Sequence, residues 1–126
     1  MTRYRALHHH AFTHPVGEDD RARSFYTGVL GLVEVPKPET MDRSKGAWFR
    51  TDGVEIHAIP DPDFRPNRLG HPAFVVADLD GLTARLRAAG ADVEPDDRFP
   101  GHRRVHSYDV FGNQLEFLEP LTEDPS

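Results

Sequence analysis

Histidine is the residue type in this sequence with the clearest capacity for chemistry. The chain has 126 residues, of which eight are histidine and none is cysteine. Imidazole is the commonest protein ligand for transition metals, and it titrates near physiological pH. The lack of cysteine excludes disulfides, cysteine zinc fingers, iron–sulfur clusters and thiol nucleophiles. Metal binding by histidine and carboxylate side chains is therefore the chemistry that this composition favours.

Four side chains of metal-ligand type occupy matching places in predicted strands. The strands are expected over residues 7–13, 54–59, 71–76 and 114–118. Successive side chains of a strand point to opposite faces of the sheet. One face is bulky and apolar and is expected to be covered by helices. The other carries small residues such as Ala11 and Ala73, and with them the four candidate metal ligands, His9, His57, His71 and Glu116.

This donor set indicates which ions would bind. Three imidazoles and one carboxylate suit a divalent transition ion such as zinc, iron(II), nickel, manganese or cobalt, whereas calcium and magnesium prefer oxygen ligands. Four protein ligands leave an open position only on a five- or six-coordinate ion, and Lewis-acid chemistry needs that position. Glu116 is the only carboxylate of the set, so it is also the predicted catalytic general base.

The elements that must position these residues occur twice. Helices are predicted after the first and the fifth strand, so the order is βαβββ, a connector and βαβββ again. The helix-ending Gly31 and Gly90 are 59 residues apart, as are the turn residues Gly53 and Gly112. This spacing indicates an internal repeat. The predicted fold class is α+β, with one strand at the start and one at the end of each module supplying a ligand.

Charge and hydropathy exclude several classes of partner. Fifteen basic and twenty-one acidic residues give a net charge of −6, and the isoelectric point is about 5.7. This balance argues against binding to nucleic acid or to an anionic membrane surface. No apolar run approaches the ~18 residues of a membrane helix, and no signal peptide is evident. We therefore expect a cytoplasmic protein with a polar tail over residues 121–126.

Five segments together resemble the vicinal-oxygen-chelate superfamily, which includes glyoxalase I, bleomycin-resistance proteins, fosfomycin-resistance enzymes and extradiol dioxygenases. They are HHHAF (8–12), RARSFY (21–26), VLGL (29–32), HPAF (71–74) and FGNQLEF (111–117). The resemblance implies one glyoxalase-like domain over residues 1–126, with βαβββ modules at about 6–60 and 70–120 forming an open, barrel-like mixed sheet. It also implies a homodimer with shared active sites, and by position it implies the same four ligands.

The resemblance leaves the reaction open. The implied function is metal-dependent lyase or isomerase chemistry, or oxygenase chemistry, on a small oxygen-bearing substrate that chelates the ion. The alternative is a metal-free, drug-binding protein of the bleomycin-resistance kind. Addition of a thiol or water to an antibiotic, as in fosfomycin resistance, is a third possibility. The glyoxalase I pattern has glutamate where this chain has His57, which weighs against that particular reaction.

The remaining polar and aromatic residues receive secondary roles. His14, His102 and His106 are expected at the surface or at the rim of the substrate pocket. Arginines near the predicted site either hold an anionic substrate group or are simply solvated; they are Arg65, Arg103 and Arg104. Trp48 and Tyr108 either line the pocket or pack in the core.

Overall fold

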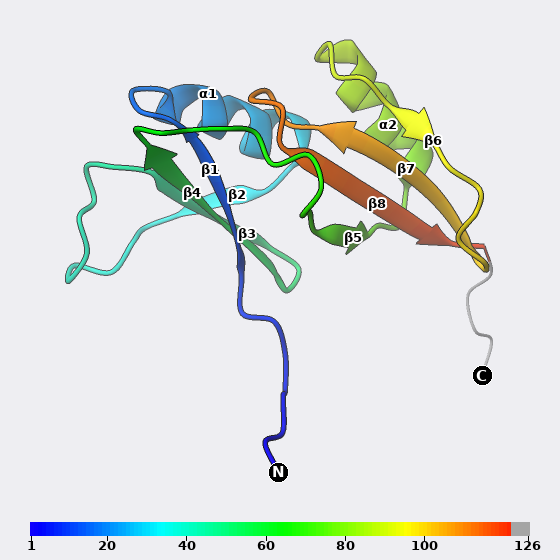
Figure 1. Ribbon diagram of the computed structural model, residues 1–126, viewed down its shortest axis with the longest axis horizontal. Helices are drawn as coiled ribbons and strands as arrows, with labels where there is room; N and C mark the ends of the chain where they lie inside the picture. The colour runs from blue at the N-terminus through cyan, green and yellow to red at the C-terminus, as the bar shows by residue number, and fades with distance from the viewer. Residues whose placement is uncertain (122–126) are drawn as a thin grey trace. The chain divides into compact units, whose positions relative to one another are not determined.

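The computed structural model describes residues 1–121 and contains two compact units (Figure 1). Unit 1 is Met1–Phe64 and unit 2 is Arg65–Ser126. Each unit has the order βαβββ and one mixed four-stranded sheet. The predicted α+β class with two βαβββ modules is therefore confirmed. Of the polar tail predicted over 121–126, residues 122–126 lie outside the described part of the chain.

Unit 1 has the sheet order β1-β4-β3-β2, in which β1 runs parallel to β4 and the other neighbours are antiparallel. Its strands are β1 (His10–Pro15), β2 (Val33–Val35), β3 (Ala47–Thr51) and β4 (Val54–Asp61). The single helix predicted after β1 is observed as α1 (Asp19–Arg23) continued by a π-helical segment, η1 (Ser24–Val29). Aromatic and aliphatic side chains of helix and sheet form the core, chiefly Phe12, Phe25, Tyr26, Phe49 and Ile56.

The β3–β4 hairpin of unit 1 is closed by a two-residue turn. Asp52 and Gly53 both have positive φ, 48° and 83°. A two-residue turn with this backbone matches the natural twist of paired strands, and glycine adopts it without strain. The turn sets the register, so that Trp48 lies directly opposite His57.

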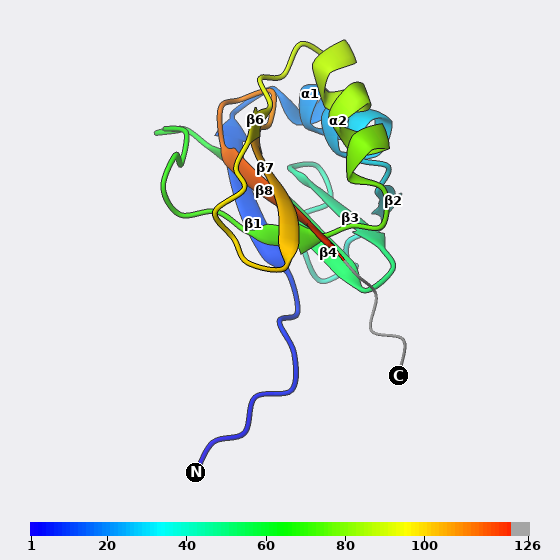
Figure 2. The ribbon, with the colours of Figure 1, turned by 90° about the vertical axis from the view of Figure 1, so that its right-hand side faces the viewer.

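Unit 2 repeats this arrangement with the sheet order β5-β8-β7-β6, in which β5 is parallel to β8. Its elements are β5 (Ala73–Val75), α2 (Leu79–Ala88), β6 (Glu94–Pro95), β7 (His102–Tyr108) and β8 (Gln114–Pro120). Asp78 caps α2 by accepting a hydrogen bond from the Gly81 backbone N–H. Figures 1 and 2 show α2 on one face of this sheet. The buried core comprises Leu79, Leu82, Leu86, Val105, Leu115 and Phe117.

A longer turn joins β7 to β8. The Asp109 carboxylate accepts hydrogen bonds from the backbone N–H groups of Phe111 and Asn113. Gly112 has a φ of 91°, and a Cβ atom there would lie 3.3 Å from the Cβ of Pro66. Both constraints favour glycine. This fixed turn places His106 of β7 directly opposite Glu116 of β8.

The two parallel strand pairs share one register. Ala11 pairs with His57 in unit 1, and Ala73 pairs with Glu116 in unit 2. The duplication inferred from glycine spacing is therefore visible in the strand pairing itself. The first strands begin later than predicted, at His10 rather than 7 and at Ala73 rather than 71. In unit 2 the delay follows Pro72, which has no N–H to give to a strand ladder.

Within the described residues, no helix combines the length and the hydropathy that crossing a membrane would require.

Candidate metal centre

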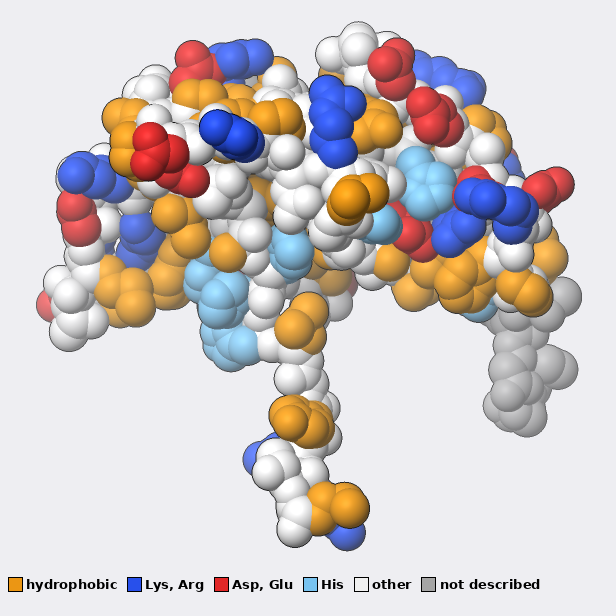
Figure 3. All heavy atoms as spheres, in the orientation of Figure 1, with side chains coloured by type: hydrophobic (Ala, Val, Ile, Leu, Met, Phe, Trp, Pro, Cys, Tyr) orange, Lys and Arg blue, Asp and Glu red, His pale blue; other side chains and the backbone are white. Residues whose placement is uncertain are grey.

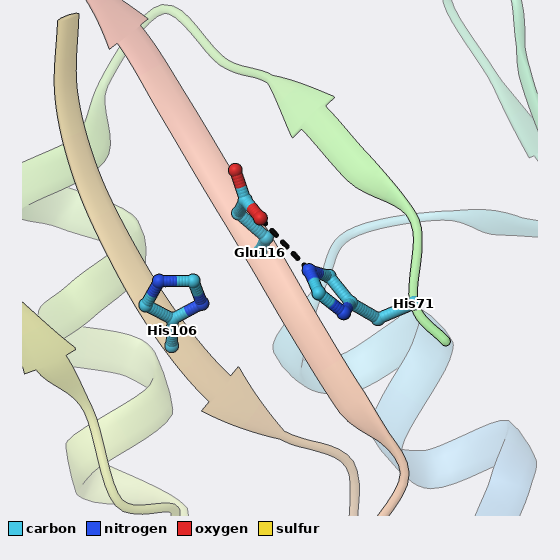
Figure 4. Close-up of side chains that lie close together, drawn as sticks. All are labelled: His71, His106 and Glu116. Atoms are coloured by element: carbon cyan, nitrogen blue, oxygen red, sulfur yellow. Dashed lines mark hydrogen bonds and ion pairs between the residues drawn. The ribbon is translucent and has the colours of Figure 1, made fainter. Parts of the chain in front are cut away.

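Unit 2 brings three side chains of metal-ligand type together. Ligand atoms of His71, His106 and Glu116 all lie within 4.8 Å of one another. Figure 4 shows the three side chains pointing toward one another, from the segment before β5, from β7 and from β8. Among residues 1–121, no other set of three histidine or acidic side chains meets this spacing.

His71 is held by its own loop and by Glu116. Its Nδ1 donates to the Leu69 carbonyl oxygen over 2.6 Å, and its Nε2 lies 2.8 Å from Glu116 Oε1. The loop is anchored at Asn67, whose backbone carbonyl accepts from the Gln114 N–H. Oxygen atoms face both ring nitrogens, and the His71 Nε2–Glu116 Oε1 contact is a hydrogen bond with one proton between the two atoms. A cation bound between Nε2 and the carboxylate would replace that proton.

His106 faces the same place from β7. Directly opposed residues of antiparallel strands have Cβ atoms about 5 Å apart, which brings His106 beside Glu116. Its Nδ1 lies 3.3 Å from the Gln114 side-chain amide nitrogen, and its Nε2 lies 3.2 Å from Asp96 Oδ2. Because an amide nitrogen can only donate, Nδ1 accepts and Nε2 carries the hydrogen given to Asp96.

Asp96 is the anionic centre of the surrounding network. Arg98 donates to its carboxylate through Nε and one terminal nitrogen, and Arg104 donates to it over 2.8 Å. The hydrogen bonds from Arg98, with those of His106 and the charge of Arg104, hold the pKa of Asp96 far below its usual range. The second arm of Arg104 lies 3.5 Å from Glu116 Oε2. Figure 3 shows histidine, acidic and basic side chains close together at the surface of the molecule.

Unit 1 arranges the matching residues differently. The rings of His9 and His57 stack with their centres 3.8 Å apart. Trp48 stacks on His57 with a centre distance of 3.9 Å and an interplanar angle of 1°. His57 is 7% exposed, whereas His9 is exposed. The His57 ring is therefore in contact with an aromatic ring on each side.

Glu55 fixes the edge of the His57 ring. Its carboxylate contacts His57 Nε2 and Arg50 Nε, each at 2.7 Å. These hydrogen bonds, first that with His57 and then that with Arg50, lower the pKa of Glu55 to about 2. Burial lowers the pKa of His57, while the bond to Glu55 acts in the opposite direction. His57 is thus held as a neutral imidazole near pH 7, which is the form that binds metals.

The four sequence-predicted ligands fall into two pairs, each within one unit. The structure brings His71 together with Glu116, and it brings His9 together with His57. Sequence reasoning missed the placement of His106. The cross-strand register carried the signal, because counting back from the Asp109–Asn113 turn places this residue opposite Glu116.

Several secondary expectations are settled by the contacts. His14, expected at the surface or the pocket rim, is 1% exposed and its Nε2 lies 2.6 Å from Asp19 Oδ1. That expectation was wrong, because the acidic start of α1 supplies a polar partner that permits burial. Arg103 pairs with Asp80 of α2 over 2.5 Å.

The donor set of unit 2 fits a divalent transition ion. Two imidazole nitrogens and one carboxylate oxygen are ligands that zinc, iron, manganese and cobalt accept. Each imidazole has one nitrogen engaged by an oxygen outside the triad, which orients the other nitrogen. His71 and Glu116 are the residues that would hold the ion in the predicted set.

A comparison with protein families shows the superfamily to which the chain belongs. Residues 6–117 match the family model of the Glyoxalase/Bleomycin resistance protein/Dioxygenase superfamily. The chain belongs to this superfamily. A structure described as a putative glyoxalase family protein from Bacillus anthracis has a TM-score of 0.88 and 36% sequence identity to it. The match covers 95% of this chain and 99% of that protein.

Two more distant similarities establish less about this chain. A mutant of the fosfomycin resistance protein FosX from Listeria monocytogenes, complexed with Mn(II) and a dihydroxypropylphosphonic acid, has a TM-score of 0.77 and 19% identity over 94% of each chain. At that identity the similarity establishes the fold alone. "Glyoxylase I 4" of Arabidopsis thaliana is 27% identical over 81 residues, which are 58% of this chain and 46% of the plant protein. The chain thus matches about half of that relative's length.

Proposed function

We propose that this protein is a metal-dependent enzyme of the glyoxalase type, acting on a small oxygen-bearing substrate by lyase or isomerase chemistry or by oxygenase chemistry. The observation that carries the proposal is the contact of His71 Nε2 with Glu116 Oε1 at 2.8 Å, between an imidazole and a carboxylate from two different strand segments. Superfamily membership supports the same conclusion. His9 and His57 are proposed as further ligands of the same ion, in a homodimer with shared sites.

In this proposal the ion and the side chains of the protein have different chemical roles. A divalent transition ion supplies Lewis acidity, which lowers the pKa of bound oxygen groups and stabilises developing negative charge. Glu116 is proposed as the group that accepts and returns the substrate proton. It is 7% exposed, and a carboxylate shielded from water is suited to proton transfer. Arg104, beside Glu116 Oε2, is placed to face an anionic substrate group.

Metal analysis tests the proposal first. We expect about one ion per chain in the purified, untagged protein, and loss of that ion in both His71→Ala and Glu116→Ala. Glu119→Gln is a suitable control, because this carboxylate of the same strand instead accepts a hydrogen bond from the Leu79 N–H of α2. A fully stable wild-type protein that binds no transition metal would overturn the proposal and favour a metal-free drug-binding protein.

Activity is the second test. The protein reconstituted with zinc, iron(II), nickel, manganese or cobalt would be assayed with substrates of the glyoxalase, fosfomycin-resistance and extradiol dioxygenase classes. We expect turnover with at least one metal and one class, and loss of turnover in Glu116→Gln. Turnover that is equal with and without chelator would contradict a metal-dependent reaction.

A further inference from the structure

We propose that His106 is a ligand of the ion held by His71 and Glu116, and that Asp96 is the residue that positions its ring. This inference rests on the proposed function, since it concerns the same ion. It adds a donor that the sequence pattern placed at the pocket rim. It also makes unit 2 a three-donor site in its own right.

The first argument is the position of His106 in the sheet. His106 and Glu116 are directly opposed across the β7–β8 ladder. Both lie on the face away from the apolar core, since the adjacent Val105, Leu115 and Phe117 are buried in it. The β7–β8 turn fixes this register, so the two side chains are brought together by the backbone. Figure 4 shows the His106 ring beside Glu116 and His71.

The second argument is the hydrogen assignment of the ring. Gln114 donates to His106 Nδ1, and His106 Nε2 donates to Asp96. A histidine that binds a metal commonly gives its other N–H to a carboxylate or a backbone carbonyl, which fixes the tautomer and raises the basicity of the ligand nitrogen. Asp96 plays that part for His106, so Nδ1 is the ligand atom, and the Gln114 amide that donates to Nδ1 must turn away when the ion binds. The Leu69 carbonyl plays the same part for His71, leaving Nε2.

The third argument concerns Asp96 itself. An aspartate that served only to stabilise the sheet would already be satisfied by Arg98 and Arg104, which both donate to it. The hydrogen bonds from these two guanidinium groups hold its carboxylate in place. It can therefore hold the His106 N–H at a fixed orientation, as a positioning residue must.

The number of donors is compatible with catalysis. Three ligands from unit 2 leave three positions of a six-coordinate ion. A substrate that chelates the ion needs two of these positions, so at most one of His9 and His57 binds together with it; if both bind, the substrate is held through a single oxygen.

The test compares four proteins by metal titration and by the visible absorption of the cobalt(II) form. The proteins are wild type, His106→Gln, Asp96→Asn and the matched control His102→Gln, which changes a histidine of the same strand outside the triad. We expect His106→Gln to bind cobalt(II) at least about tenfold more weakly, with an altered spectrum and unchanged thermal unfolding of the apoprotein. Asp96→Asn should lower affinity about 10- to 100-fold with all three ligands still present. His102→Gln should match wild type.

The outcomes separate this inference from the proposed function. If His71→Ala abolishes cobalt binding while His106→Gln keeps the affinity and the spectrum of wild type, His106 is not a ligand and the proposed function stands. If the wild-type protein binds no cobalt(II), both fail. Should His106→Gln not fold, Asp96→Asn decides, because it leaves the imidazole in place. Wild-type affinity and spectrum in that variant would overturn the proposal.

Discussion

The two units use one backbone plan for different purposes. His9, His57 and Trp48 of unit 1 occupy the places that His71, Glu116 and His106 occupy in unit 2. In unit 1 these side chains form an aromatic stack, and in unit 2 they form a cluster of donor atoms. Strand pairing therefore fixes where the side chains meet, while residue type decides whether they form a ring stack or a cluster of donor atoms.

The cross-strand neighbour makes most of this difference. Trp48 offers a flat apolar surface, against which the His57 ring is held at 3.9 Å. His106 offers a nitrogen, beside the carboxylate of Glu116. His57, although it also contacts the Glu55 carboxylate, is covered by a ring on each face and stabilises its unit by burial, whereas His71 and His106 bring two imidazoles to one carboxylate, which is a donor set for a cation.

The largest expected effect is on metal binding, and its absence would contradict the difference between the two units. Glu116→Gln should weaken manganese(II) binding at least about 100-fold. This is more than the loss usual for a residue that only hydrogen-bonds to a ligand. His57→Gln should cost less than about tenfold, because the three donors of unit 2 remain. Isothermal titration of both variants measures the difference. Equal losses at the two positions would show that the units contribute equally to the ion.

Removing the aromatic surface of unit 1 should have the next largest effect. Trp48→Ala is expected to lower the free energy of unfolding by about 2–3 kcal/mol, somewhat less than a fully buried tryptophan because this side chain is only half-buried. Urea denaturation measures the change, and Trp48→Phe, which keeps a ring, is the control. A Trp48→Ala variant as stable as wild type would mean that the stack contributes no packing energy.

Acid should lower the stability of unit 1 through protonation of Glu55. Its pKa is about 2 in the folded chain against an ordinary value of 4.5, so its contribution to stability is complete above about pH 4.5 and is lost as pH falls toward 2. Glu55→Gln should therefore be less stable than wild type near neutral pH and should lose less stability on acidification. Urea unfolding between pH 6 and 3 measures both slopes. Parallel slopes would contradict the lowered pKa.

The smallest effect is expected at an exposed ion pair of unit 2. Asp80 is 76% exposed in its contact with Arg103, and such pairs contribute about 0–1 kcal/mol. Asp80→Asn should change the unfolding free energy by less than about 1 kcal/mol and should leave metal affinity unchanged. A loss of metal binding in this variant would show that the ion pair of Asp80 with Arg103 supports the donor cluster.

The fold could be predicted from the sequence because the equal spacing of its turn glycines reveals the repeat. Gly53 and Gly112 are both turn residues of positive φ, and each lies between two antiparallel strands of its unit. It could not predict that the helix of unit 1 widens to a π-helix from Ser24, since this depends on backbone hydrogen bonds such as that from Leu30 N–H to the Phe25 carbonyl.

The candidate site was only partly within reach of the sequence. Alternation along single strands finds His71 and Glu116, because each is read against its own neighbours. His106 requires the pairing between strands, which depends on the length of the β7–β8 turn. His14 was misplaced because its partner, Asp19, was interpreted only as a charge at the start of a helix.

The length of the β7–β8 turn can also be used to classify relatives of this chain. This length sets a sequence separation of ten between the histidine and the glutamate that oppose each other, His106 and Glu116. A single inserted or deleted residue would rotate that histidine to the opposite side of the sheet, into the apolar layer. Family members that keep both the spacing and the histidine would keep this cluster of donor side chains, and those with a turn of another length would lose it.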